Sequence, residues 1–317
     1  MTSRYTLQIN LSPGDLLYGE RTVPALIESH RRHAESVLLV VDLCRPERTI
    51  SVDPDRKFPL ELFRERCEQT RALAARIQAL ARVDEVVFLE AGDPIHRRLN
   101  KRWLGIDIRR THDFSGCALT AYFAGFDLPK TRHVLHYDAD VLLYQSDDFD
   151  WGIAAMKAAE ARPDVLATSP RLTPPFDRDA PEQRPGLPQT RVSGGWVDAW
   201  FSTRCLMIDR ARMDKQLPLV RSPKRLAIYT ARWWTGRGWP PSPELLIHQN
   251  AGDRGMRRLI LDDPRAWILH PNPKNDQYYT LLDGIMASVA RGDVPDEQRG
   301  LQDLALDAWS RRLMASR

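Results

Sequence analysis

The chain has 317 residues, of which 43% are apolar and 28% charged, and its formal net charge is +4. A chain of this length and composition can bury a sizeable core, which excludes a disordered protein and fits one large α/β domain or two closely joined lobes. The 46 basic and 42 acidic residues are spread along the whole sequence without a basic tail. This charge pattern gives little support for a nucleic-acid partner and would equally suit a diphosphate pocket, so charge alone does not choose between them. We expect no nucleic-acid partner.

The cysteines and the apolar runs bear on where the protein works. The four cysteines, Cys44, Cys67, Cys117 and Cys205, have neither CxxC spacing nor the density of a disulfide-rich secreted domain. They are therefore expected to be reduced thiols in the core. No apolar signal segment follows Met1, and no run approaches about eighteen consecutive apolar residues. We expect a cytoplasmic protein without a transmembrane segment, for which peripheral contact with a membrane surface stays open.

Repeated strand-then-helix units in the first part of the chain predict an α/β fold, with a mostly parallel sheet flanked by helices. The apolar run Val-Leu-Leu-Val-Val near residue 40 suits a strand that is buried on both faces of such a sheet. We assign residues 1–145 to a nucleotide-binding half. Its strands are expected at 5–11, 36–42, 85–89 and 133–137, and its helices at 23–32, 60–81 and 114–125.

Residues 146–317 are expected to form an acceptor-binding and metal-completing half of the same domain. Residues 170–188 contain six prolines, which indicates a long surface loop rather than a linker between domains. The other expected elements are a helix at 151–162, strands at 165–169 and 201–209, a helix at 243–252 and, before a Pro-rich tail, a strand at 266–270.

Two carboxylates follow the strand predicted at 133–137, in the segment 134–140, Val-Leu-His-Tyr-Asp-Ala-Asp. Alternate residues of an extended chain point the same way, so Asp138 and Asp140 can present two carboxylates to one cation at the edge of the sheet. Such a cation can bridge the phosphates of a nucleotide sugar and stabilise the departing diphosphate. An isolated Asp-x-Asp is usually a solvated turn, but its place after an apolar strand favours a functional site.

This segment resembles the hallmark of the GT-A class of glycosyltransferases, in particular family 2-like enzymes, in which an apolar strand runs into Asp-x-Asp. The resemblance extends over residues 5–280 and is best in the motif. It implies a GT-A type, Rossmann-like fold with a C-terminal acceptor-side region, hexosyltransferase-like activity, a UDP- or GDP-sugar donor, and Mn²⁺ or Mg²⁺. It also implies that Asp138 lies near the ribose or reaches the cation through water, and that Asp140 coordinates the cation directly. The acceptor stays open among carbohydrate, lipid-linked and small molecules.

Many enzymes of this class take a third metal ligand from a histidine at the end of a late strand. The segment 267–274, Trp-Ile-Leu-His-Pro-Asn-Pro-Lys, resembles that element. His270 can bind a cation through a neutral imidazole nitrogen, and Lys274 can pair with the diphosphate as the leaving group gains charge. The spacing is not a fixed signature, so a capping or buried histidine and a solvated lysine are the alternatives.

An inverting transfer needs a carboxylate that takes the proton from the acceptor hydroxyl, and related enzymes place it at the start of a helix that faces the sugar. Glu244 fits this position because it follows Ser242 and Pro243, a helix-opening sequence. The helix dipole by itself also favours an acidic residue in a first turn. Asp198, just before a predicted strand, is the second candidate. The sequence does not decide between inversion and retention.

Three tryptophans, Trp233, Trp234 and Trp239, fall within seven residues that also contain glycines. Sugar rings present apolar faces that stack on indoles, and glycine favours a loop, so this segment is predicted to bind the acceptor. A core cluster is an equally good explanation of the same residues.

The nucleotide side of the site is predicted from the family resemblance and from the position of basic residues. Asp42, at the end of the second strand, stands where the family often uses an acidic residue to contact uracil or ribose. Arg109 and Arg110 precede the helix predicted at 114–125 and can hold phosphate, although solvated arginines are the more common case.

A haloacid-dehalogenase-type phosphatase is the strongest rival, because its nucleophile also lies in an apolar strand followed by Asp-x-Asp. Residues 259–263, Leu-Ile-Leu-Asp-Asp, are similar to its late metal ligands. That family usually carries its motif near the N-terminus, whereas 137 residues precede Asp138 here. A nucleotidyltransferase would share the fold but normally has a Gly-rich, Arg-containing loop at its start. A noncatalytic module that binds metal and glycan would need neither a base nor a diphosphate site.

Overall fold

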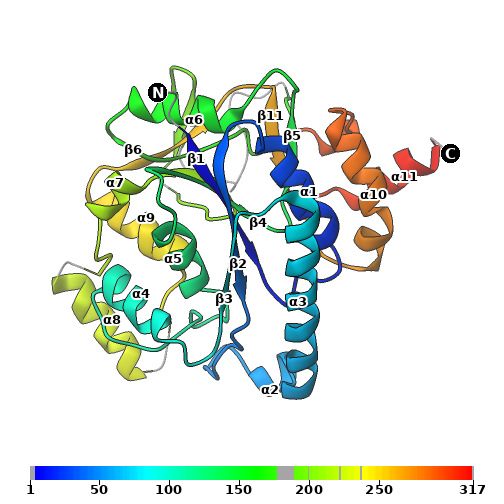
Figure 1. The fold of residues 1–317 in the computed structure, drawn as a ribbon. Helices are drawn as coiled ribbons and strands as arrows, with labels where there is room; N and C mark the ends of the chain where they lie inside the picture. The colour runs from blue at the N-terminus through cyan, green and yellow to red at the C-terminus, as the bar shows by residue number, and fades with distance from the viewer. Residues whose placement is uncertain (1–3, 177–188, 199, 221–222, 236–237, 316–317) are drawn as a thin grey trace.

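The computed structural model describes residues 4–176, 189–198, 200–220, 223–235 and 238–315. Helices cover both faces of a large central sheet (Figure 1). Of the nine strands described in this sheet, all run in one direction except β8 and β9. The predicted α/β class, with a mostly parallel sheet flanked by helices, is confirmed.

The strand order in the central sheet is β3-β2-β1-β4-β9-β6-β10-β8-β7, and β5 pairs with β11 in a second, two-stranded sheet. Strands from both predicted halves of the chain therefore belong to one sheet. The strands are β1 (Tyr5–Leu11), β2 (Ala34–Asp42), β3 (Glu85–Leu89), β4 (His133–Asp138), β5 (Leu142–Gln145), β6 (Val165–Ser169), β7 (Gln189–Val192), β8 (Gly195–Asp198), β9 (Cys205–Asp209), β10 (Arg257–Leu261) and β11 (Ala266–Leu269).

The helices pack on the sheet through apolar stripes, and most of those predicted from the sequence begin and end within a few residues of the expected positions. None of the helices in the described residues combines the length and apolarity that a membrane span needs. The α-helices are α1 (Gly19–His30), α2 (Pro54–Lys57), α3 (Leu60–Ala81), α4 (Pro94–Leu104), α5 (Thr120–Asp127), α6 (Trp151–Glu160), α7 (Arg210–Asp214), α8 (Pro223–Thr235), α9 (Pro243–Asp253), α10 (Asp276–Ala290) and α11 (Leu306–Ala315), with a short 3-10 helix at Asp296–Gln298.

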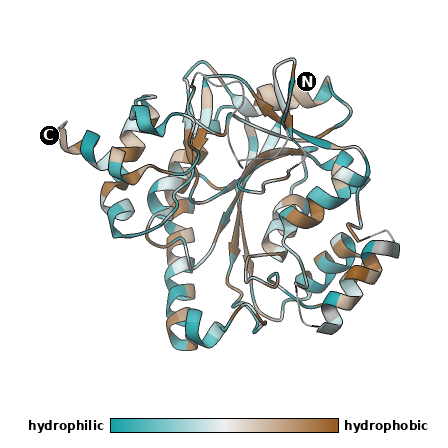
Figure 2. Cartoon of the chain, turned by 180° about the vertical axis from the view of Figure 1, so that it is seen from behind, coloured by the Kyte–Doolittle hydropathy of each residue, from teal (hydrophilic) through white to brown (hydrophobic). Residues whose placement is uncertain are grey.

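Strand β2 explains why the central strands are apolar on both sides. Leu39 and Val41 belong to the core that α1 and α3 cover, whereas Leu38 and Val40 belong to the core that α4 and α5 cover. These two groups of helices lie on opposite sides of the sheet (Figure 1). Apolar residues are accordingly concentrated on the central strands, and the outer helices carry hydrophilic residues (Figure 2). Burial on both faces is the usual reason for continuous apolar runs in parallel strands.

The helix predicted at 114–125 begins only at Thr120, because the residues before it form a turn. The carboxylate of Asp113 accepts hydrogen bonds from the backbone N–H groups of Ser115, at 2.8 Å, and Cys117, at 2.9 Å. Between these two residues, Gly116 has a φ of 84°, a left-handed conformation that glycine adopts without steric cost. Local side-chain hydrogen bonds of this kind compete with helix formation.

Three other predictions need correction. The strand predicted at 201–209 begins at Cys205. The tail is not merely Pro-rich, because α10 and α11 follow β11, and Asn275 caps α10 by accepting a hydrogen bond from the backbone N–H of Tyr278 at 3.0 Å. The tryptophan segment is not a loop throughout, because α8 ends only at Thr235. Most of the predicted 170–188 loop lies outside the described residues.

The pairing of β1 with its neighbours brings their carboxyl ends to one edge of the sheet. β1 is parallel to both β2 and β4, and Asn10 on β1 lies opposite Asp138 on β4. The loop that follows β1 must therefore run past the Asp138 segment, since parallel strands end at the same edge. This edge carries the side chains described next.

Candidate active site

Asp138 is the last residue of β4 and is half-buried. The phenol of Tyr122, on α5, donates to its two carboxylate oxygens at 2.8 and 2.9 Å. His136 Nε2 lies 3.3 Å from Asp138 Oδ1. The first carboxylate of the motif is therefore held mainly by a neutral donor, in a fixed orientation toward the edge of the sheet.

A chain of polar side chains lies behind Asp138. The ring of His136 is buried and its Nδ1 is hydrogen-bonded to Gln8 Oε1, and Gln8 in turn donates to Asn10 Oδ1 at 2.9 Å. Gln8 and His136 are partners across the β1–β4 pair, so their side chains point to the same face. Sequence reasoning missed His136, although it stands two residues before Asp138 and the period of a strand places both on one face.

Asp140 is buried and is surrounded by cations instead. Lys274 Nζ lies 2.5 Å from Asp140 Oδ2, and His270 Nε2 lies 3.5 Å from the same oxygen. The other oxygen, Oδ1, is buried without a hydrogen-bond partner in the described residues. Burial by itself raises the pKa of this carboxyl, but the hydrogen bonds and charges of His270 and Lys274 outweigh it and bring the pKa below its usual range.

His270 follows β11 and is oriented by a second carboxylate. Its Nδ1 lies 3.1 Å from Asp303 Oδ1, and Asn272 donates to Asp303 Oδ2, also at 3.1 Å. Although burial lowers the pKa of His270, its hydrogen bonds to Asp140 and Asp303 raise it above its usual value overall. A carboxylate on Nδ1 fixes the ring with Nε2 toward Asp140, as supporting groups do for histidine metal ligands. No sequence signal near His270 indicates Asp303, which lies 33 residues later.

Lys274 connects Asp140 to the loop after β1. Besides its ion pair with Asp140, its ammonium donates to the Tyr18 phenol at 2.9 Å, and Tyr18 donates to the carboxylate of Asp15. Burial raises the pKa of Asp15 to about 6, against the opposing effects of Tyr18 and Lys274, and the carboxylate of Asp140 raises the pKa of Lys274 despite its burial. Sequence reasoning missed Asp15 and Tyr18. The turn Ser12-Pro13-Gly14 after the first strand was the available signal.

The donor set around Asp140 fits a cation that arrives with phosphate oxygens. Among the residues that the structure describes, no three His, Cys, Asp or Glu side chains are placed to hold a metal ion by themselves. Mg²⁺ and similar cations are, however, commonly held by one or two protein carboxylates together with substrate phosphates. The unpartnered Oδ1 of Asp140 and the oriented imidazole of His270 are suitable ligands of this kind. Lys274 is the competing cation at the same carboxylate.

Glu244 lies at the first turn of α9, where Ser242 caps the helix by accepting from the backbone N–H of Leu245 at 3.3 Å. Its Oε1 accepts from the backbone N–H of Thr203 at 2.9 Å, and the Thr203 hydroxyl lies 3.4 Å from the same oxygen. Tyr122, which donates to Asp138, also lies within the electrostatic influence of Glu244. Burial first, and then the charges of Asp138 and Glu244, raise the pKa of Tyr122 well above its usual range.

Asp198, the second candidate base, is buried at the end of β8. Its Oδ2 forms an ion pair with the buried Arg258 at 2.8 Å, and its Oδ1 accepts from the backbone N–H of Trp200 at 2.7 Å. Both oxygens of Asp198 are therefore engaged by protein groups, whereas within the described residues only Oε1 of Glu244 is. Glu244 is the better placed of the two candidates to meet an acceptor hydroxyl.

Asp42, at the end of β2, is buried with one oxygen satisfied and the other not. Its Oδ1 accepts from the backbone N–H of Cys44 at 2.9 Å, whereas Oδ2 has no hydrogen-bond partner within the described residues. His112 Nε2 lies 3.9 Å from this second oxygen. Arg110 forms an ion pair with Glu47 at 2.5 Å, and Arg109 is exposed. Of these predicted nucleotide-side residues, Asp42 has the clearest unmet hydrogen-bonding capacity.

The three tryptophans do not form one surface. Trp234 is 84% exposed on α8, whereas Trp239 is buried and packs against Tyr229 with ring centroids 5.2 Å apart. Trp233 is also in α8, but its side chain lies outside the described part of the structure. Trp239 therefore fits the core explanation, and Trp234 is exposed as a ligand surface would require. An acceptor-binding role for any of the three stays a prediction.

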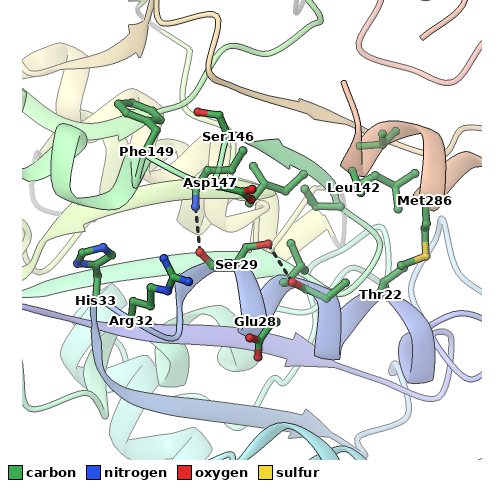
Figure 3. Close-up of a pocket in the computed structure, with 17 residues that line it drawn as sticks. Thr22, Glu28, Ser29, Arg32, His33, Leu142, Ser146, Asp147, Phe149 and Met286 are labelled. Carbon is green, nitrogen blue, oxygen red and sulfur yellow. Dashed lines mark hydrogen bonds between the residues drawn. The ribbon is translucent and has the colours of Figure 1, made fainter. Parts of the chain in front are cut away.

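A separate cavity of about 420 Å³ lies between α1, the segment after Asp140 and α10 (Figure 3). Thr22, Ser29, Leu142, Phe149 and Met286 are among its lining residues. Ser29 accepts through its carbonyl from Gln145 at 2.9 Å, which ties α1 to β5. The site residues described above do not line this cavity, so we do not assign it to the candidate active site.

No protein-family model matches the chain, and no curated protein sequence is significantly similar to it. Solved structures with a similar course of the chain include apo xyloside xylosyltransferase 1 from mouse, at 12% identity and a TM-score of 0.40, over 82% of this chain and 85% of that one. Galactosyltransferase LgtC with donor and acceptor sugar analogues aligns at 11% identity and a TM-score of 0.38, over 92% and 98% of the two chains. UDP-glucose pyrophosphorylase from Acinetobacter baumannii aligns at 9% identity and a TM-score of 0.40, over the whole of both chains. Matches of this strength do not distinguish glycosyl transfer from nucleotidyl transfer, so the function has to be inferred from the site itself.

Proposed function

We propose that this protein is a metal-dependent, inverting glycosyltransferase that moves a sugar from a UDP- or GDP-sugar to an acceptor hydroxyl. The observation that carries the proposal is the environment of Asp140. A buried carboxylate with one unpartnered oxygen is shared by Lys274 and His270 beside Asp138, at the carboxyl edge of the sheet. This arrangement concentrates oxygen ligands and mobile positive charge where a diphosphate can lie.

Each residue has a defined part in this proposal. Asp140 and His270 would hold a divalent cation, with Asp138 reaching it directly or through water. Such a cation would supply positive charge that offsets the charge of the leaving diphosphate. Lys274 exchanges its contact with Asp140 for one with the diphosphate and stabilises the negative charge as the bond between sugar and phosphate breaks.

Glu244 is proposed as the base. One of its oxygens, Oε1, is held by Thr203, which orients the carboxylate. The other oxygen accepts the proton of the acceptor hydroxyl as that hydroxyl attacks the anomeric carbon, and the nucleoside diphosphate leaves from the opposite face. The product therefore has the inverted configuration at that carbon.

The phosphatase alternative receives less support from the same residues. The late carboxylates that it would use as metal ligands are already paired. Asp262 forms an ion pair with Arg191 at 2.8 Å and another with Arg171, and Asp263 forms one with Arg265 at 2.8 Å. Both oxygens of Asp262 and both of Asp263 are contacted by arginine, whereas Asp140 keeps Oδ1 without a partner in the described residues and open to a cation.

Calorimetric titration with UDP and with GDP, in manganese and in excess chelator, tests the proposal. One of the two nucleotides is expected to bind, and to bind tightly only with manganese. Asp140→Asn is expected to weaken the manganese-dependent binding by at least about 10- to 100-fold, the loss seen when groups that merely support a metal ligand are removed. Asp148→Asn, an exposed aspartate just after β5, is the matched control and is expected to bind normally.

Equal nucleotide affinity in manganese and in chelator would contradict the metal dependence. Lys274 would then be the cation that contacts the diphosphate. If neither nucleotide binds under any condition, glycosyl transfer is wrong. Glycan binding without nucleotide binding would then identify the noncatalytic module, and release of phosphate from small phosphomonoesters would identify the phosphatase.

A further inference from the structure

Helix α8 has an outward face that is apolar. Leu226 is 48% exposed, Ile228 43% and Trp234 84%. Leu226 and Ile228 mark the two sides of the exposed half of α8, and Trp234 lies between them in direction, about two turns along the helix from Leu226. The other exposed residues described in this interval are Ala227, Thr230 and Ala231, so this half of the helix carries no acidic residue. Large apolar side chains gathered on one exposed helix face usually indicate a surface that binds something, whereas single ones do not.

The opposite face of α8 holds the helix on the protein. Tyr229 is buried against Trp239, and its phenol is hydrogen-bonded to Gln249 on α9. Arg225 forms an ion pair with Asp253, also on α9, at 2.6 Å. Because α8 is anchored from behind, its outward apolar face is a fixed feature of the molecular surface.

The sequence around α8 is basic. In the sequence, residues 215–243 contain six basic residues and no Asp or Glu. Helix α4 lies next to α8 at the same edge of the molecule (Figure 1), and the segment before α8 is tied to it by the hydrogen bond from Leu219 N to Trp103 O at 2.7 Å. The exposed residues of α4 after its first turn are all basic, namely Arg97, Arg98, Lys101 and Arg102.

The basic residues of α4 differ in how far their charge is neutralised. Arg97 forms an ion pair with Asp107, and Arg102 forms ion pairs with Asp127 and Asp214. Arg98 and Lys101 make no side-chain hydrogen bond or ion pair within the described residues. These two positive charges, on the helix next to α8, are therefore available to a negatively charged partner.

We propose that α8 and α4 together form a docking surface for an anionic lipid bilayer. A helix that presents tryptophan and aliphatic side chains beside a basic surface matches the interface of such a membrane, where the apolar groups enter the headgroup region and the cations meet anionic lipids. A second copy of the chain is the weaker fit, because it would bring two basic surfaces together. The surface is independent of the proposed transfer reaction and binds lipid without donor or acceptor.

Sedimentation with vesicles tests this surface, with the full-length protein and no nucleotide. The protein is expected to sediment with vesicles of phosphatidylcholine and phosphatidylglycerol, and to remain in solution with phosphatidylcholine alone. Arg98→Ala and Lys101→Ala are each expected to weaken binding about fivefold, since one basic residue near an anionic surface contributes about 1 kcal/mol. Leu226→Ala combined with Trp234→Ala is expected to weaken it at least tenfold.

Matched substitutions on α3 separate a specific surface from general stickiness. Leu80→Ala removes a leucine that is 68% exposed, and Arg64→Ala removes an exposed arginine. Both variants are expected to bind vesicles like the wild type. The proposal is overturned if the wild type does not sediment with anionic vesicles, or if the α3 variants lose as much binding as the α8 and α4 variants. It is also overturned if the Trp234 variant dissociates a dimer in lipid-free gel filtration.

Discussion

Two carboxylates at the carboxyl edge of the sheet, Asp140 after β4 and Asp42 at the end of β2, are prepared for a ligand in different ways; their surroundings are called the two ends of the site. Around Asp140, the carboxylate is already matched by the charges of Lys274 and His270. At Asp42, one buried carboxylate oxygen has no hydrogen-bond partner within the described residues, and His112 Nε2 lies 3.9 Å from it. Among the same residues Asp140 also keeps one buried oxygen without a partner, so the two ends differ in the internal ion pair with Lys274 that Asp140 makes.

This difference predicts different consequences of ligand binding at the two ends. At Asp140 a phosphate or a cation must replace an internal ion pair, so its net affinity is a difference between two strong interactions. At Asp42 a donor group of the ligand completes a missing hydrogen bond. Because a buried acceptor without a partner costs free energy, this contact favours binding. We expect the first end to control turnover and metal dependence and the second to control nucleoside affinity.

The largest effect is expected at Glu244, the proposed base. Glu244→Gln keeps the size of the side chain and an oxygen for Thr203 but cannot take up a proton, so turnover is expected to fall ~10²- to 10⁴-fold with donor affinity retained. Steady-state kinetics together with calorimetry of the nucleoside diphosphate measure the two quantities separately.

Glu61→Gln provides the control, because Glu61 is also an acidic residue in a first turn, on α3. It is expected to be fully active. Turnover of Glu244→Gln near the wild-type level, or retention of the anomeric configuration by NMR of the product, would contradict the role of Glu244 as base.

At the charge-paired end, Lys274→Met is expected to weaken binding of the nucleoside diphosphate about 10- to 100-fold, the contribution of a hydrogen bond between charged groups. The same substitution removes the cation that competes for Asp140, so Mn²⁺ without nucleotide is expected to bind more tightly than in the wild type. Calorimetric titration measures both affinities.

Lys130→Met, at an exposed lysine before β4, is the matched control and should change neither affinity. If Lys274→Met weakens the binding of Mn²⁺ alone as much as that of the nucleotide, the lysine acts by holding the site together. The comparison between the two ends would then have to be abandoned.

The smallest effect is expected at the Asp42 end. Asp42→Asn keeps an acceptor for the N–H of Cys44 but turns an amide donor toward the ligand. The affinity for the nucleoside diphosphate is therefore expected to fall about tenfold, and its dependence on manganese is expected to stay the same. The control is Asp84→Asn. Asp84 directly precedes β3, and its carboxylate accepts from the backbone N–H of Val37 near the start of β2. An unchanged affinity in Asp42→Asn would place the nucleoside elsewhere.

How much of the site can be predicted from the sequence depends on how far its parts lie apart in the chain. Asp138 and Asp140 are predictable, because an apolar strand before an Asp-x-Asp is a local pattern. Glu244 is predictable because the helix start at Ser242 and Pro243 is also local. Asp15 and Asp303 are not predictable, because each acts on a residue that is distant in the sequence. Asp15 acts on Lys274 through Tyr18, and Asp303 acts on His270.

The sequence by itself determines the α/β class, the strands that are buried on both faces and the presence of two carboxylates at a strand end. These features follow from apolar periodicity and capping residues within short windows. Only the tertiary structure decides that Asp138 meets a neutral phenol whereas Asp140 meets two cations. The physical reason is that a carboxylate's charge environment is set by whichever side chains the fold packs within a few ångströms, and here those side chains come from α5, from the end of β11 and from the loop that follows it.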